Sequence, residues 1–304
     1  MGAAASWIHR TRVNARDAVE LVIVPGMAAW LPWPVCFRLF RWLAVNVPWL
    51  YRASCEAALQ QAHARGWVPK GQRQHWIAQR RLVTLVDHAD LYLSATRSDR
   101  WMQRHLDVRG AWPAAGHAGI LCTFHWGAGM WGLRHMRSKG LQASALVAAL
   151  GGAPFAGRPV LHWYARRRTA MVTQVLGVPA LDVSASLRPA LRALRESAQV
   201  LAAIDVPADQ VAGCLPVSFA GEAALVPKAL LRLAVDHHIP VTVYLTGLDM
   251  TTGQRHLAVH SLGAYTDAQA LADAVFGFLD EAIHSQSTAW HFWSEAPRFF
   301  RGHE

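Results

Sequence analysis

The chain has 304 residues, with 30 Lys+Arg against 20 Asp+Glu, and is 53% hydrophobic but only 16% charged. This composition is sufficient for a sizeable core and excludes a disordered chain. Four widely spaced cysteines without a CxxC pair exclude a disulfide scaffold and indicate a reduced compartment. The net charge of +10 is almost all arginine. Two explanations of this positive charge are open: codon usage, or binding to an anionic partner. No nucleic-acid-binding motif is present, so the functional explanation is an anionic membrane surface or an acidic protein.

Residues 18–50 are the most apolar part of the chain. Three prolines between Pro25 and Pro34 interrupt the run, so a single spanning helix is disfavoured. We expect two short helices, broken near Pro25–Pro34, that lie in or dip into one leaflet; the alternative is a buried hairpin of a soluble domain. The predicted division is a membrane-associating helical segment over 1–50 and an α/β domain over 51–304.

The remainder begins with a long amphipathic helix over 76–93, followed after Gly110 by apolar runs that alternate with helical patterns. Strands are expected at 119–124, 143–148, 200–204, 215–219, 241–246 and 256–260, and helices at 127–139, 159–176, 187–197, 225–237 and 267–284. This alternation predicts an α/β fold with a mixed, largely parallel sheet sandwiched by helices.

Two polar residues come directly after expected strands: His125 follows the strand at 119–124, and Asp205 follows the strand at 200–204. In such sheets the chemistry lies beyond the carboxyl ends of the strands. Trp126, Gly127 and Gly129 then open a glycine-rich helix start, whose free N–H groups are suited to holding an oxyanion. We therefore interpret His125 as a general base; the alternative is a structural histidine in a tight turn.

The segment 123–131 (TFHWGAGMW) resembles the H-x-G-N-W-E box of the bacterial lipid A late acyltransferases, which belong to the lysophospholipid acyltransferase superfamily with its HX4D/E motif. The similarity continues in order along the chain. It includes arginines 166–168, the segment VLAAIDVPADQ at 200–210, VSFAG at 217–221, WHFW at 290–293 and RFF at 298–300.

The resemblance implies transfer of an acyl chain from an acyl carrier protein or coenzyme A thioester to a hydroxyl or amine of a lipid A-like glycolipid or a related lipid or metabolite. It implies neither a metal nor a redox cofactor, and it places the protein at the cytoplasmic face of the bacterial inner membrane. Arg166, Arg167 and Arg168 would bind a phosphate of the acceptor or of phosphopantetheine; the alternative is a solvated basic helix face. The terminal aromatic residues are expected in core or membrane-edge packing.

The chain departs from the family motif at the acid of the catalytic pair, and Ala128 also replaces the asparagine of the box. Met130 stands where the acid of the HX4D/E pair belongs. Three explanations are open: another carboxylate, Asp205 or Glu222, supplies the role; His125 acts alone on a more acidic nucleophile; or the protein is a catalytically inactive relative that binds lipid or carrier protein. A soluble hydrolase ranks lower, because no G-x-S-x-G elbow is present.

Overall fold

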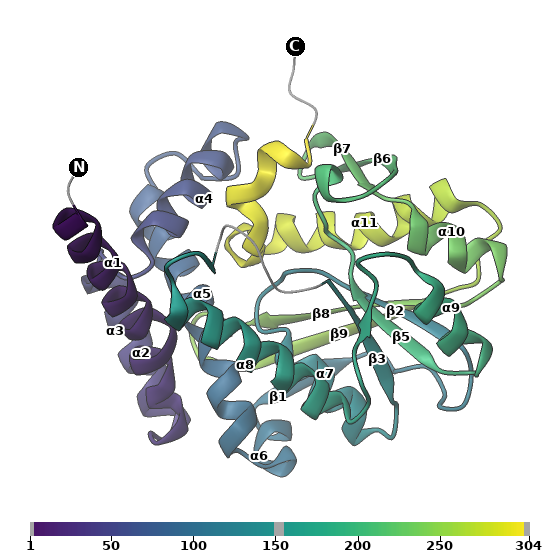
Figure 1. The fold of residues 1–304 in the computed structure, drawn as a ribbon, viewed down its shortest axis with the longest axis horizontal. Helices are drawn as coiled ribbons and strands as arrows, with labels where there is room; N and C mark the ends of the chain where they lie inside the picture. Colours follow the sequence, from purple (N-terminus) through teal and green to yellow (C-terminus); the bar gives the residue numbers. More distant parts are fainter. Residues whose placement is uncertain (1–2, 149–154, 301–304) are drawn as a thin grey trace.

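A seven-stranded sheet organises the structure, a computed structural model that describes residues 3–148 and 155–300 (Figure 1). The strand order is β1-β9-β8-β2-β5-β3-β4. The strands are β1 (Leu106–Arg109), β2 (Gly119–Thr123), β3 (Ala143–Val147), β4 (Leu181–Asp182), β5 (Gln199–Ala203), β8 (Val241–Leu248) and β9 (Arg255–Gly263). All neighbours pair in parallel except β8 and β9. The expected α/β class with a mixed, largely parallel sheet is confirmed.

Helices cover both faces of the sheet. In Figure 1, α11 lies on one side of the sheet and α7 and α8 on the other. On β2, Ile120 and Cys122 belong to the core cluster that includes residues of α11, while Leu121 belongs to the cluster that includes residues of α7 and α8. This two-sided burial explains why β2 is a continuous apolar run without alternation. The helices are α4 (Arg52–Ala64), α5 (Arg73–Thr96), α6 (Asp99–Gln103), α7 (Met130–Ser138), α8 (Pro159–Leu176), α9 (Arg188–Arg195), α10 (Ala229–Asp236) and α11 (Ala268–Ser285).

The N-terminal segment forms two helical stretches along one side of the molecule (left in Figure 1). The first runs through α1 (Ala3–Ala18), a π-helical turn (η1, Val19–Ile23), α2 (Val24–Gly26) and a 3₁₀ turn (η2, Met27–Ala29); the second is α3 (Trp33–Asn46). The chain thus breaks within the expected interval, just before Trp33, and Pro25 is accommodated at the start of α2. Within residues 3–148 and 155–300, no helix combines the length and apolarity needed to cross a bilayer.

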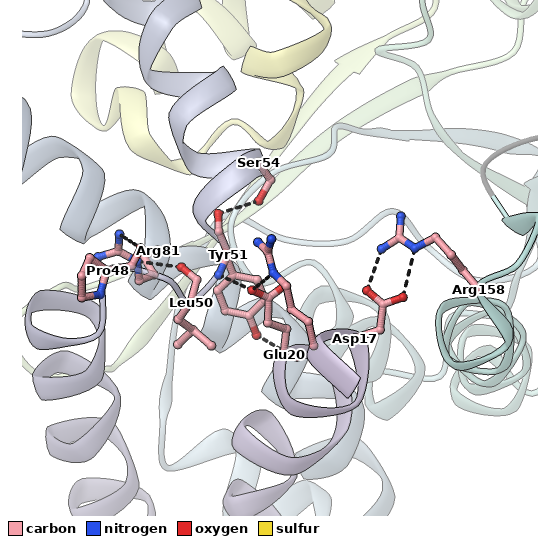
Figure 2. A network of polar contacts seen from close by, with 9 residues as sticks. Asp17, Glu20, Pro48, Leu50, Tyr51, Ser54, Arg81 and Arg158 are labelled. Atoms are coloured by element: carbon pink, nitrogen blue, oxygen red, sulfur yellow. Dashed lines mark hydrogen bonds and ion pairs between the residues drawn. The ribbon is translucent and has the colours of Figure 1, made fainter. Parts of the chain in front are cut away.

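Polar contacts tie this N-terminal segment to the rest of the chain (Figure 2). Asp17 of α1 forms a two-pronged ion pair with Arg158, which precedes α8, at 2.6 and 3.0 Å. Glu20 accepts the backbone N–H of Tyr51 at 2.7 Å, and Arg81 of α5 donates to carbonyls at the end of α3 and in the following turn. These contacts fix the first helices against α4, α5 and α8.

A hairpin replaces part of a predicted helix. The pattern over 225–237 predicts helix throughout, but α10 starts only at Ala229, because Leu225–Pro227 belong to β7 (Glu222–Pro227), which pairs with β6 (Cys214–Phe219). Ala220 and Gly221 have φ of 52° and 76°, as a two-residue hairpin turn requires. The short strands β1 and β4 also have no counterpart among the predicted strands.

Candidate active site

His125 and Asp205 lie side by side beyond the carboxyl ends of two adjacent strands. β2 and β5 are parallel, with Thr123 opposite Ala203 in the register, and each polar residue follows two positions later. The imidazole Nδ1 of His125 lies 2.8 Å from Oδ1 of Asp205. The register of the sheet therefore creates this pair, as the positions of the two residues in the sequence predict.

The carboxylate of Asp205 has no exposed surface, and N–H groups surround it. The backbone N–H of His125 lies 3.0 Å from both oxygens, and the indole Nε1–H of Trp290 donates to Oδ2 at 3.0 Å. A buried carboxylate is costly unless such donors satisfy it. These contacts therefore keep Asp205 fixed as a hydrogen-bond acceptor.

The imidazole of His125 remains accessible, with 42% of its side chain exposed. The ring of Phe292 stacks on it at 4.0 Å, with 20° between the planes. Because the carboxylate only accepts, Nδ1 carries the hydrogen, and the lone pair is on Nε2. Within residues 3–148 and 155–300, Nε2 has no hydrogen-bond partner. This is the arrangement required of a general base.

A segment near the C-terminus closes this site. It comprises η5 (Ser287–Ala289), Trp290 and η6 (His291–Arg298), and Trp290 forms a β-bridge with Trp126. The backbone N–H of His291 donates to the carbonyl of His125 at 2.7 Å, and its Nε2 lies 3.0 Å from the carbonyl oxygen of Gly127. The terminal aromatics expected in core packing are indeed largely buried, but Trp290 and Phe292 also contact the His125–Asp205 pair.

Arg80 of α5 holds this segment in place. Its guanidinium donates to the carbonyls of Thr288 at 3.1 Å, Trp290 at 2.9 Å and His291 at 3.1 Å. The side chain is 5% exposed. Sequence reasoning missed Arg80, because an arginine within an amphipathic helix carries no signal of inward orientation. The same reasoning missed the role of Trp290.

The glycine-rich turn supplies fewer free donors than expected. The N–H of Gly127 donates to the carbonyl of Ala289 and that of Ala128 to the carbonyl of Thr246, so neither is free to hold an oxyanion. Gly127 is required sterically: it has φ of 51°, and a Cβ there would lie 2.4 Å from the carbonyl oxygen of Thr246. The N–H of Gly129 has no acceptor within the described parts of the chain and remains the candidate donor.

Trp126 points to a different place from His125. It is 6% exposed and lines a cavity of about 1050 Å³ together with Trp67, Gly247 and Thr288. His125 does not line this cavity. Trp126, predicted to contact substrate, therefore faces this cavity and not the exposed ring of His125. Its β-bridge with Trp290 supports the segment that closes the site.

Glu222 does not join the site. At the start of β7 its carboxylate lies 3.1 Å from Nε of Arg65 at the end of α4. In the described parts of the chain it makes no hydrogen bond or ion pair with His125 or Asp205. Of the two carboxylates considered as replacements for the missing acid, the structure brings only Asp205 to His125.

The three predicted phosphate-binding arginines separate into two groups. Arg168 turns inward, lying 2.7 Å from Oδ1 of Asp87, and donates to the hydroxyl of Tyr164. This inward orientation does not fit the expectation of a phosphate contact. Arg166 and Arg167 are exposed and line a surface groove of about 460 Å³ with His162 and Trp163.

Buried titratable groups lie behind the site. Burial raises the pKa of Asp87, but Arg168, His291 and His88 together outweigh it, and the pKa falls to about 2. Burial lowers the pKa of His88 to about 3 and that of His291 to about 4. His291 is therefore neutral near pH 7, accepting from Arg80 at Nδ1 and donating from Nε2 to Gly127.

Met130, at the position of the family's acid, is 3% exposed and packs with Leu121 and Tyr244 in the core on the α7 side of the sheet. No protein-family model matches the chain, and no curated protein matches it significantly. The resemblance to the late acyltransferases therefore stays a prediction.

Proposed function

We propose that this protein is a membrane-associated acyltransferase with His125 as general base. It moves an acyl chain from a carrier-protein or coenzyme A thioester to a hydroxyl or amine of a lipid A-like glycolipid or a related lipid or metabolite. The observation that carries the proposal is the accessible Nε2 of an imidazole whose Nδ1 is held by the buried Asp205. Of the three explanations for Met130, this geometry favours replacement of the acid by a carboxylate from elsewhere.

In the proposed reaction, Nε2 of His125 takes the proton of the acceptor O–H or N–H while the acceptor atom attacks the thioester carbonyl. The carbonyl oxygen gains negative charge in the tetrahedral intermediate, and the N–H of Gly129, which has no acceptor in the described parts of the chain, is the candidate donor to it. The C–S bond then breaks, and the leaving thiolate receives the proton from the imidazolium. Asp205 stabilises that imidazolium and keeps its ring oriented.

An exposed face of α3 that combines apolar residues with an arginine supports membrane association. Val35, Arg38, Trp42 and Val45 are all exposed and recur at helical spacing, opposite the buried face of α3. Trp30 next to it is 87% exposed. Exposed tryptophans beside arginines are typical of a helix at the headgroup boundary, and the net charge of +10 favours an anionic leaflet at the cytoplasmic face of the inner membrane.

The experiment that tests the proposal is mass spectrometry of lipid extracts and metabolites from bacteria expressing the intact protein, His125→Ala or His117→Ala. His117 is an exposed histidine just before the opposite end of β2 and is the matched control. We expect a species heavier by one acyl group with the intact protein and with His117→Ala, and its loss with His125→Ala.

A product that persists in His125→Ala overturns the role of His125. Identical profiles for all three folded, membrane-bound proteins, repeated with purified protein and carrier-protein and coenzyme A thioesters, overturn acyl transfer and favour the inactive lipid- or carrier-binding relative.

A further inference from the structure

The second oxygen of the Asp205 carboxylate has its own dedicated donor. Oδ1 receives the ring Nδ1–H of His125 at 2.8 Å, whereas Oδ2 receives the indole Nε1–H of Trp290 at 3.0 Å. The backbone N–H of His125 lies 3.0 Å from both oxygens and does not distinguish between them. Trp290 is therefore the contact that, together with His125, fixes the orientation of the carboxylate plane.

The indole of Trp290 cannot readily change its orientation. The side chain has no exposed surface, and rings meet it edge-on at 5.1 Å from Trp293, 5.6 Å from Phe219 and 5.6 Å from Phe299. Its backbone is held by Arg80 and by the bridge to Trp126. A rotation of the carboxylate would leave this N–H without an acceptor in a dry environment, which is costly.

We propose that Trp290 is a positioning residue for His125, acting through Asp205. Its N–H donates to Oδ2 and so keeps Oδ1 aligned with Nδ1 of His125. The imidazole ring is thereby held in one orientation, and with it the direction of the lone pair on Nε2. The same N–H draws negative charge toward Oδ2, which limits how strongly Asp205 stabilises a proton on His125. The assignment to catalysis rests on the proposed function, whereas the effect on the titration of His125 does not.

In the described parts of the chain, the charged and titratable groups around Trp290 and His291 come from three elements. His291 lies on the same segment as Trp290, Arg80 and Asp87 lie on α5, and Arg168 lies on α8. Substitution of Trp290 alters none of them. A change in the titration of His125 in such a variant therefore reports on Asp205.

The test compares Trp290→Phe with Trp293→Phe in the full-length protein. Trp293 is equally buried and also donates its Nε1–H, but to the carbonyl of Ser287 at 2.6 Å. NMR of histidine-labelled protein, with His125→Gln to assign the resonance, gives the apparent pKa of His125 in each variant. We expect Trp290→Phe to shift the titration midpoint upward, because the carboxylate loses one hydrogen bond and stabilises the protonated ring more strongly. Trp293→Phe keeps an aromatic ring against Trp290 and does not remove the donor to Oδ2, so it should leave the pKa unchanged.

A second measurement uses the wild-type fold. In tryptophan-labelled protein, one indole N–H resonance should shift with the apparent pKa of His125 and lose that response in His125→Gln. If His125 titrates identically in wild type and a folded Trp290→Phe variant, or if no indole resonance follows it, the positioning role is wrong. Where acyl transfer is measurable, its pH–rate profile should shift with the NMR titration. Absence of transfer with a shifted titration rejects the proposed function alone.

Discussion

Arg255 and Asp90 form an ion pair sealed from solvent, with no exposed surface on either side chain. The guanidinium lies between two indoles, 4.2 Å from the ring of Trp33 and 4.0 Å from that of Trp131. These residues come from β9, α5, α3 and α7. One buried cation thus joins the N-terminal helices to the sheet.

Breaking this pair on one side should be costly. Asp90→Leu leaves the guanidinium buried without its counter-ion, and we expect the free energy of unfolding to fall by about 3–5 kcal/mol. The double variant Asp90→Leu/Arg255→Met removes both charges, so its free energy of unfolding should fall much less. Urea unfolding of the single and double variants measures these differences. A double variant whose loss equals the sum of the two single losses would contradict the coupling.

Asp205→Asn tests which carboxylate supports His125. The amide of asparagine has one oxygen acceptor where the carboxylate has two. Either the ring N–H of His125 or the indole N–H of Trp290 therefore faces an N–H₂ group and loses its acceptor. Transfer should fall on the order of 10³- to 10⁴-fold, as for a serine-protease triad without its charged aspartate. Glu222→Gln, which affects only the ion pair with Arg65, should stay close to wild type in the same rate assay. The reverse ranking would make Glu222 the partner.

An acid introduced at position 130, where the resembled family carries one, should not increase activity. Met130→Glu places a carboxylate in the core beside Leu121 and Tyr244, and we expect a loss of about 3 kcal/mol or more in unfolding free energy. Met130→Leu conserves volume and should cost less than about 1.5 kcal/mol. Chemical denaturation checks both. A stable Met130→Glu protein with faster transfer would favour a decayed motif over a repurposed site.

Acid should destabilise the protein through its buried histidines. The pKa of His88 is about 3 and that of His291 about 4, both below the value of about 6.5 of an unfolded histidine. Between the folded and unfolded pKa values, the unfolded state binds more protons than the folded state. The contribution of the two neutral histidines to the free energy of unfolding is therefore complete above about pH 7 and is lost as the pH falls toward 4. Burial raises the pKa of Asp90, which acts in the opposite sense.

A difference between variants isolates the His88 contribution. His88→Gln should reduce the slope of unfolding free energy against pH, between about pH 6 and 4, by up to about 1.4 kcal/mol per pH unit. The exposed His117→Gln is the control. Equal slopes in urea unfolding for wild type and His88→Gln would show that His88 takes up its proton without unfolding.

The exposed tryptophans of the N-terminal region should drive membrane binding. Trp30, Trp42 and Trp49 are 87%, 57% and 52% exposed. Replacing all three with alanine should weaken binding to anionic vesicles by about tenfold or more, since each indole buries apolar surface in lipid. Trp163→Ala, which removes a 50% exposed tryptophan on α8, is the control in the sedimentation assay. Equal binding by all three proteins would contradict a membrane-facing α3.

The main strands and the His125–Asp205 pair could be predicted because they depend on local pattern and sheet order. β2 and β5 are buried apolar runs, and a polar residue after each marks the same edge. By contrast, β4 has two residues, too few for any period, and β7 begins EAAL, a sequence equally suited to a helix.

The support of the site could not be predicted for a different reason. Arg80 and Trp290 are 210 positions apart and meet only through tertiary packing. Nothing in the local sequence distinguishes the indole that donates to Asp205 from that of Trp293, which donates to Ser287. The choice between Asp205 and Glu222 likewise depended on the hairpin of β6 and β7, which directs Glu222 toward Arg65.

The segment that closes the site is synthesised after the residues that it contacts. His125 and Asp205 are synthesised long before Ser287–Arg298, which carries Trp290 and Phe292. An emerging chain can therefore pair β2 with β5 while the carboxylate still lacks its indole donor and the imidazole still lacks its stacking ring. The N-terminal helices leave the ribosome before that segment, so they are complete while the His125–Asp205 pair still lacks it.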